Sequence, residues 1–134
     1  MEYTEKERLM LVDIKREISQ NSKKLIENID NIVTFSSTRY CNDITEILSK
    51  VSTLSSYAKP DFELSSINDI IAYMMMLANI VGRGKKDNRL SELKALTYMF
   101  VSAINSIQFD FQKKRFSINL KEIKLGNINL SKLI

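Results

Sequence analysis

The residues of this chain that could do chemistry are mostly cations, because the usual catalytic side chains are scarce. The 134 residues include no histidine and one cysteine, Cys41. Without histidine there are no Ser-His or Cys-His nucleophilic pairs, no histidine general base and almost no route to a zinc or haem site. Asp43 and Glu46 lie one helical turn apart, but such pairs are commonplace on solvated helix surfaces. We therefore expect no catalytic residues, no metal site and no cofactor, and the chain is not expected to be an enzyme.

Positive charge is concentrated in the last third of the chain. Residues 1–81 carry nine basic and twelve acidic side chains, whereas residues 82–134 carry eleven basic and four acidic ones, which gives a net −3 and a net +7. The basic residues form two clusters: Arg83, Lys85, Lys86 and Arg89, and then Lys113, Lys114 and Arg115. A helix of about twenty residues separates the clusters, so we expect them roughly 30 Å apart.

Two cationic points at that separation could straddle several phosphates of a nucleic-acid backbone. Aromatic residues close to the second cluster could stack bases: Tyr98, Phe109, Phe111 and Phe116. The first functional hypothesis is therefore a non-enzymatic, nucleic-acid-binding accessory subunit of a larger complex. The alternative for the same residues is that they are solvated loop cations that confer solubility.

Three consecutive methionines, Met74, Met75 and Met76, are the second unusual feature. Soft, unbranched methionine side chains line adaptable binding surfaces, and they also fill irregular cores. Three consecutive helical positions cover most of a helix circumference, so at least one should face away from the domain's own core. These residues support the second functional hypothesis, a helical protein–protein interaction module or homo-oligomer, while core filling remains open.

The compartment follows from cysteine usage and from the apolar runs. Cys41 is alone, so no intramolecular disulfide can form, and nothing indicates an oxidising compartment. We interpret Cys41 as a small buried hydrophobe, with a reactive thiol as the alternative. The longest apolar run, residues 70–78, is less than half of the ~20 residues that a membrane span needs. We expect an intracellular, cytoplasmic protein without a membrane span.

The elements that position these residues are predicted to be four helices. Apolar residues recur at three- and four-residue steps over about 5–34, from Tyr40 to about 57, from Ser66 to Gly82, and over about 90–109. Thr4 and Glu7 fit a capping box, and Gly82 and Gly84 are expected to end the third helix. The fourth helix is apolar around most of its circumference, which predicts that it is the central, most buried one.

The tail reads differently from the helices. Phe116, Ile118 and Leu120 alternate with polar residues, and Gly126-Asn127 suggests a turn, which together predict a short β-hairpin within residues 115–130. A helix also fits the spacing and stays open. The expected fold is all-α: a four-helix, bundle-like domain over 1–109, with a C-terminal appendage over 110–134 packed on the same domain.

Two segments show faint likeness to known families. Residues 35–39, together with residues 81–83, resemble the small helical subunits of CRISPR effector complexes, which implies basic residues lining a nucleic acid. Residues 78–84, followed by the helix from Leu93 to Ile107, resemble the poxviral Bcl-2-like proteins, which implies action on a host protein partner. Each likeness covers about half of the chain, and we assign the chain to neither family. The abundance of Ile, Lys, Asn and Ser suggests a viral or mobile-element origin.

Overall fold

The computed structural model describes residues 2–84 and 87–123. These residues form four long helices: α1 (Glu5–Asp30), α2 (Ser37–Ser55), α3 (Leu64–Gly82) and α4 (Asp87–Ile104). Three short strands accompany them: β1 (Lys59–Pro60), β2 (Gln108–Asp110) and β3 (Arg115–Ser117). Two 3-10 turns complete the set: η1 (Ile32–Thr34) and η2 (Leu120–Glu122). The structure confirms the predicted helical bundle with a small β appendage.

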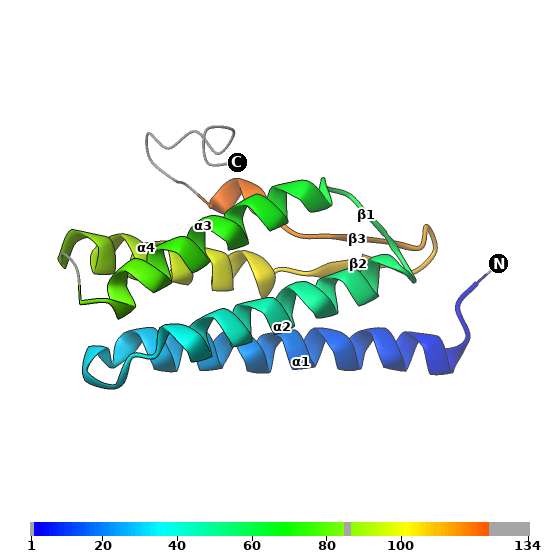
Figure 1. Ribbon diagram of the computed structural model, residues 1–134. Coiled ribbons are helices and arrows are strands. Elements are labelled where there is room, and N and C mark those ends of the chain that lie inside the picture. The colour runs from blue at the N-terminus through cyan, green and yellow to red at the C-terminus, as the bar shows by residue number, and fades with distance from the viewer. Residues whose placement is uncertain (1, 85–86, 124–134) are drawn as a thin grey trace.

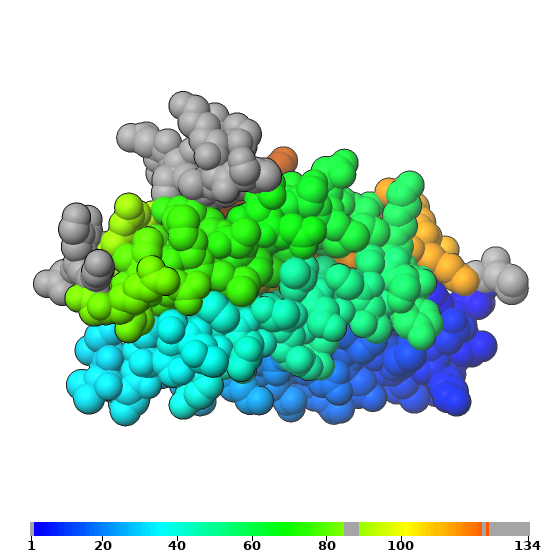
Figure 2. Space-filling model, in the orientation of Figure 1, coloured from blue at the N-terminus to red at the C-terminus, as the bar shows by residue number. Residues whose placement is uncertain are grey.

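Successive helices run in opposite directions, and each one packs against two neighbours (Figure 1). α1 contacts α2 and α4, and α3 contacts the same two helices from the other side. Figure 2 shows α2 and α3 covering most of one face of the bundle, with α1 along its edge. All four helices contribute to the buried core, which includes Leu11, Ile18, Leu25, Tyr40, Ile44, Ile47, Ile67, Met74, Leu77, Leu93, Leu96 and Phe100.

The prediction that α4 is the central helix is wrong. Because the helices form a ring of neighbours, none of them lies at the centre. α4 buries Leu93, Leu96 and Phe100 on one face, while Lys94 and Tyr98 on its other face are exposed. Its apolar residues are spread widely, but apart from the small Ala95 its exposed positions are occupied by polar or amphipathic side chains that tolerate solvent.

α1 begins as predicted and ends earlier than predicted. The Thr4 hydroxyl accepts a hydrogen bond from Glu7 N–H (3.1 Å), and Glu7 Oε1 accepts one from Thr4 N–H (2.9 Å), which confirms the capping box. The hydrogen bond from the Thr4 backbone lowers the pKa of Glu7. The helix ends at Asp30 instead of about 34, because the buried Asn28 amide pairs with both the N–H and the C=O of Ser36 and turns the chain.

The C-terminal hairpin exists, but its partner strand differs from the prediction. β2 and β3 pair antiparallel, with Phe109 opposite Phe116, and β1 joins β3 in parallel. α4 therefore ends at Ile104 instead of about 109, and the proposed domain boundary after 109 falls inside β2. Phe116 is buried and packs edge-on against Phe62 (5.4 Å between ring centroids), so burying this aromatic group fixes the register. The predicted turn at Gly126-Asn127 lies outside the described residues.

A buried hydrogen-bond chain crosses the bundle from α2 to α4. The Thr97 hydroxyl donates to the Leu93 carbonyl (2.6 Å), so the Tyr40 hydroxyl, 2.6 Å away, must donate to Thr97 Oγ1. Both side chains are fully buried, and burial raises the pKa of Tyr40. Because a buried polar group without a partner is costly, this chain fixes how α2 and α4 face each other.

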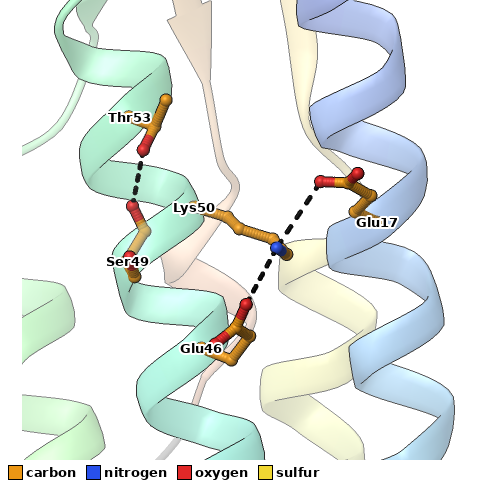
Figure 3. Close-up of polar contacts among 5 residues, drawn as sticks. All are labelled: Glu17, Glu46, Ser49, Lys50 and Thr53. Carbon is orange, nitrogen blue, oxygen red and sulfur yellow. Dashed lines mark hydrogen bonds and ion pairs between the residues drawn. The ribbon is translucent and has the colours of Figure 1, made fainter.

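On the bundle surface, Lys50 connects α2 to α1. Its ammonium lies 3.0 Å from Glu46 Oε1 on its own helix and 3.5 Å from Glu17 Oε2 on α1 (Figure 3). The hydrogen bond from Lys50 to Glu46 raises the lysine pKa, with the two carboxylate charges adding to the effect. Nearby, Thr53 donates to the Ser49 carbonyl within α2.

By length and composition alone, α3 would be able to cross a membrane. In this structure its most apolar residues, including Ile67, Met74 and Leu77, are fully buried between the neighbouring helices. Core helices of folded domains commonly meet the same criterion.

The direction of the Tyr40–Thr97 hydrogen bond leads to an asymmetric prediction. Thr97→Val leaves the Tyr40 hydroxyl buried without an acceptor, so we expect it to lower the free energy of unfolding by about 1–3 kcal/mol. Tyr40→Phe leaves Thr97 still donating to Leu93, so a smaller loss of about 1 kcal/mol is expected. Urea titrations of the single variants and of the double variant would measure this. Losses that add up fully in the double variant would contradict the proposed coupling.

Gly82 at the end of α3 lies directly against Ser37 at the start of α2, and this contact supplies a second prediction. A Cβ at this position would lie 2.6 Å from Ser37 Oγ and 2.7 Å from Ser37 Cβ. Gly82→Ala should therefore force the helices apart and lower the free energy of unfolding by about 1–3 kcal/mol. Gly82→Ala in a Ser37→Gly background should recover most of that loss. A melting temperature unaffected by Gly82→Ala would rule out the steric argument.

Candidate functional site

The most distinctive surface of the molecule is the outer face of the first three turns of α1. Leu9 is 60% exposed and Val12 is 50% exposed, although both are large apolar side chains on a helix with a complete buried face. Glu5 and Arg16 continue the same stripe at spacings of four, three and four residues, so the four side chains form a line along the helix. We call Glu5, Leu9, Val12 and Arg16 the α1 seam.

Hollows run along both sides of the α1 seam. One is lined by Tyr3, Arg8, Leu9, Val12 and Phe111 together with Glu2 and Glu5. The other is lined by Leu9, Met10, Asp13 and Ile14, together with Glu5, Lys6 and Glu17. Leu9 stands between the two hollows, so an extended partner resting on it would reach into both.

The hairpin turn forms the wall of the first hollow. Phe111 meets Tyr3 edge-on (6.1 Å between ring centroids), and the Arg8 guanidinium lies 5.3 Å from the centre of the Phe111 ring. The Tyr3 hydroxyl donates to the Tyr57 carbonyl, which ties the start of the chain to the end of α2. These contacts hold the wall against the start of α1, so the hollow is present in the free chain.

The first basic cluster lies where the sequence places it, between α3 and α4, but its members are not equivalent. Arg83 is the C-cap residue of α3 and is exposed, and Gly84 next to it adopts a left-handed conformation (φ 72°), as expected for a glycine that ends a helix. Arg89 is paired with Glu92 on α4 (3.0 Å), and Glu92 also accepts from the Tyr73 hydroxyl. Lys85 and Lys86 lie outside the described residues.

The second basic cluster is largely engaged within the fold. Arg115 pairs with Asp61 (2.8 Å), and the Lys114 ammonium lies over the Tyr3 ring, 4.6 Å from its centre. Lys114 adopts a left-handed backbone conformation (φ 53°) in the hairpin turn, which directs its side chain toward α1. Lys113 is exposed. The described members of the two clusters lie at opposite ends of the bundle, the first at the connection between α3 and α4 and the second at the turn between β2 and β3 (Figure 1).

The three methionines are separated by the fold. Met74 is fully buried, Met75 packs partly against the core, and Met76 is 40% exposed. One methionine therefore faces outward, as three consecutive helical positions require, and the run does not form one binding surface. Cys41 is half-buried against the core, and burial raises its thiol pKa, which disfavours the reactive thiolate.

Within residues 2–84 and 87–123, no three acidic or thiol side chains gather closely enough to hold a metal ion. The core of the described bundle is mostly apolar, and its buried polar side chains are Asn21, Ser22, Asn28 and Thr97, with Tyr40 paired to Thr97.

The length of the first helix makes it a candidate interaction element in the sequence, but the residues of the α1 seam were missed because the core stripe of α1 dominates its pattern. Leu11, Ile18 and Leu25 give the buried seven-residue repeat, and against it Leu9 and Val12 read as ordinary neighbours. A signal for the seam was present. Two apolar residues stand on the opposite side of the helix from that stripe, flanked by charges at heptad spacing.

If residues of the second basic cluster stabilise the fold, substituting the paired Arg115 and the exposed Lys113 should have different effects on the free energy of unfolding. We expect Arg115→Ala to lower the free energy of unfolding by up to about 1 kcal/mol, because the half-exposed Asp61 loses its partner. Lys113→Ala should leave stability unchanged. Thermal or urea unfolding of each variant would measure this, and in an Asp61→Ala background Arg115→Ala should have little further effect. An equal effect of Arg115→Ala in both backgrounds would show that the pair is unimportant.

No known protein family matches the chain, and no curated protein or solved structure is significantly similar to it. The comparisons therefore lend no support to the CRISPR-subunit or Bcl-2-like resemblances, or to a viral or mobile-element origin.

Proposed function

We propose that this chain is a non-enzymatic protein-interaction module that binds a helical partner along the α1 seam. The observation that carries the proposal is the exposure of Leu9 and Val12 between two hollows, one of them walled by Phe111. Contiguous exposed apolar surface rimmed by charged residues is typical of protein-binding sites.

The shape of the α1 seam favours a helix as the partner. Covering the exposed parts of Leu9 and Val12 is worth about 2–3 kcal/mol from apolar burial alone, before the partner's own surface is counted. The seam is straight and follows helical spacing, so an amphipathic helix lying along it would place its apolar residues in the hollows on either side. The backbone of α1 offers no free edge for a strand, because its N–H and C=O groups are used within the helix.

Polyanion binding receives less support from the geometry. Arg89, Lys114 and Arg115 make contacts within the fold, which leaves Arg83 and Lys113 as the exposed members of the two clusters among the described residues. These two side chains lie at opposite ends of the bundle, so they do not form one continuous surface for a phosphate backbone.

A non-enzymatic, intracellular role is part of the same proposal. It is supported by the absence of histidine from the sequence and by a single cysteine, Cys41, whose pKa is raised by burial. A lone, half-buried thiol fits a reducing compartment.

Selection of partner helices tests the proposal. A phage-displayed library of amphipathic helical peptides should yield binders whose affinity falls at least about tenfold for the Leu9→Asp/Val12→Asp variant, because the charges remain unpaired when covered. Val33→Asp is the matched control, since Val33 is 90% exposed at the opposite end of the bundle. Both variants should keep the helical circular-dichroism spectrum of the parent chain.

Two outcomes would overturn this function. The first is that no helical peptide binds the folded chain. The second is that all selected peptides bind the α1 double variant as tightly as they bind the parent, which would place the binding surface elsewhere.

A further inference from the structure

The α1 seam begins with an acidic residue, continues with two apolar residues and ends with a basic residue, so it is complementary to a second copy of itself in the reverse direction. From this we propose that the partner of the seam is a second copy of the chain, bound with its α1 antiparallel to the first. This inference rests on the proposed function and names the partner of the same site. It concerns Glu5, Leu9, Val12 and Arg16, all within the first three turns of α1.

The spacing of the seam is that of a helix-pairing stripe. Steps of four, three and four residues are the heptad pattern, in which alternate positions of one helix pack against those of another. In a twofold-symmetric antiparallel pair, the symmetry axis passes between Leu9 and Val12. Leu9 of each copy then packs against Val12 of the other, and this apolar layer occurs twice. Such an interface is isologous, because each residue and its counterpart exchange roles between the copies.

The charges at the two ends of the seam select the antiparallel orientation. With the axis between Leu9 and Val12, Glu5 of one copy lies opposite Arg16 of the other, again twice. A parallel pair would place Glu5 against Glu5 and Arg16 against Arg16, which is unfavourable at both ends. Charge complementarity therefore favours one orientation and disfavours the other.

The charged residues on one flank of the seam also favour the antiparallel orientation. Lys6 and Asp13 follow the seam along the flank that faces the second hollow. In the antiparallel pair these residues come within reach of each other across the interface. The opposite flank carries Arg8, which is held over the Phe111 ring, and Lys15, so like charges face each other there and this flank adds no attraction.

In the free chain, Arg16 has a partner that it would exchange for Glu5 of the second copy on dimerisation. Arg16 pairs with Asp13 on its own helix (2.8 Å), and both side chains are more than half exposed. Such an exposed pair contributes little to stability, so Arg16 can turn to Glu5 of the second copy and release Asp13 to Lys6 at little cost. The seam covers three helical turns, less than a standard interface, so we expect a weak and concentration-dependent dimer.

Sedimentation equilibrium from about 10 µM to about 1 mM tests the inference, because a weak dimer dissociates within that range. Glu5→Arg and Arg16→Glu, each alone, should weaken self-association at least about tenfold, since each turns two attractive layers repulsive. An equimolar mixture of these two variants should associate again as a heterodimer, because opposite charges then meet at both ends. The double variant Glu5→Arg/Arg16→Glu should self-associate like the parent chain.

Matched controls separate seam effects from net charge. Glu63→Arg and Arg39→Glu make the same charge changes at exposed positions outside α1 and should leave association unchanged. The mixing experiment also guards against misfolding, since a variant that fails to fold cannot regain association with its complement.

The inference is overturned if the parent chain stays monomeric up to about 1 mM. It is also overturned if the two single variants associate as well as the parent does, or if their mixture fails to associate. Such a result leaves the proposed function standing where selected helical peptides still lose binding to Leu9→Asp/Val12→Asp. Peptide binding therefore tests the proposed function, sedimentation tests the self-association, and either proposal can fail without the other.

Discussion

The arrangement of the molecule depends on a mismatch in helix length. α1 has 26 residues and is about 39 Å long, whereas the other three helices have 18 or 19 residues and are roughly 10 Å shorter. The first turns of α1 therefore extend beyond α4, and the three-stranded sheet fills the place beside them. Leu9 and Val12 stay exposed because they lie on the side of α1 that faces away from the bundle, with Phe111 of the hairpin turn beside them.

Ion pairs within the fold partly balance the uneven distribution of charge along the sequence. The acidic first part and the basic last part meet at two separate places, at the C-terminal end of α1 beside α4 and between the end of β1 and the hairpin. Asp30 on α1 lies 3.7 Å from the Lys94 ammonium and accepts a hydrogen bond from the Tyr98 hydroxyl, while Asp61 pairs with Arg115. These exposed pairs contribute modestly to stability, yet each one connects segments distant in sequence. Two of the cations in the basic last part, Lys94 and Arg115, are therefore paired within the fold and not with an external anion.

Local chemistry allowed several features to be predicted from sequence. The capping box of Thr4 and Glu7 depends on a three-residue spacing, and Gly84 ends a helix because only glycine adopts its backbone conformation without cost. The limits of α1 and α4 could not be predicted, because they depend on partners distant in sequence. Asn28 ends α1 by pairing with Ser36, and β2 forms only because β3 is there to receive it.

The sequence by itself determined the helical class, the number of long helices, their approximate order and the positions of the two basic clusters, since periodicity and composition are local properties. Only the tertiary structure decided which of those cations are engaged, which methionine is exposed and which face of α1 is left uncovered. The physical reason is that exposure and pairing belong to the contacts between elements. A residue such as Leu9 looks the same in sequence whether a neighbouring segment covers it or leaves it to a partner.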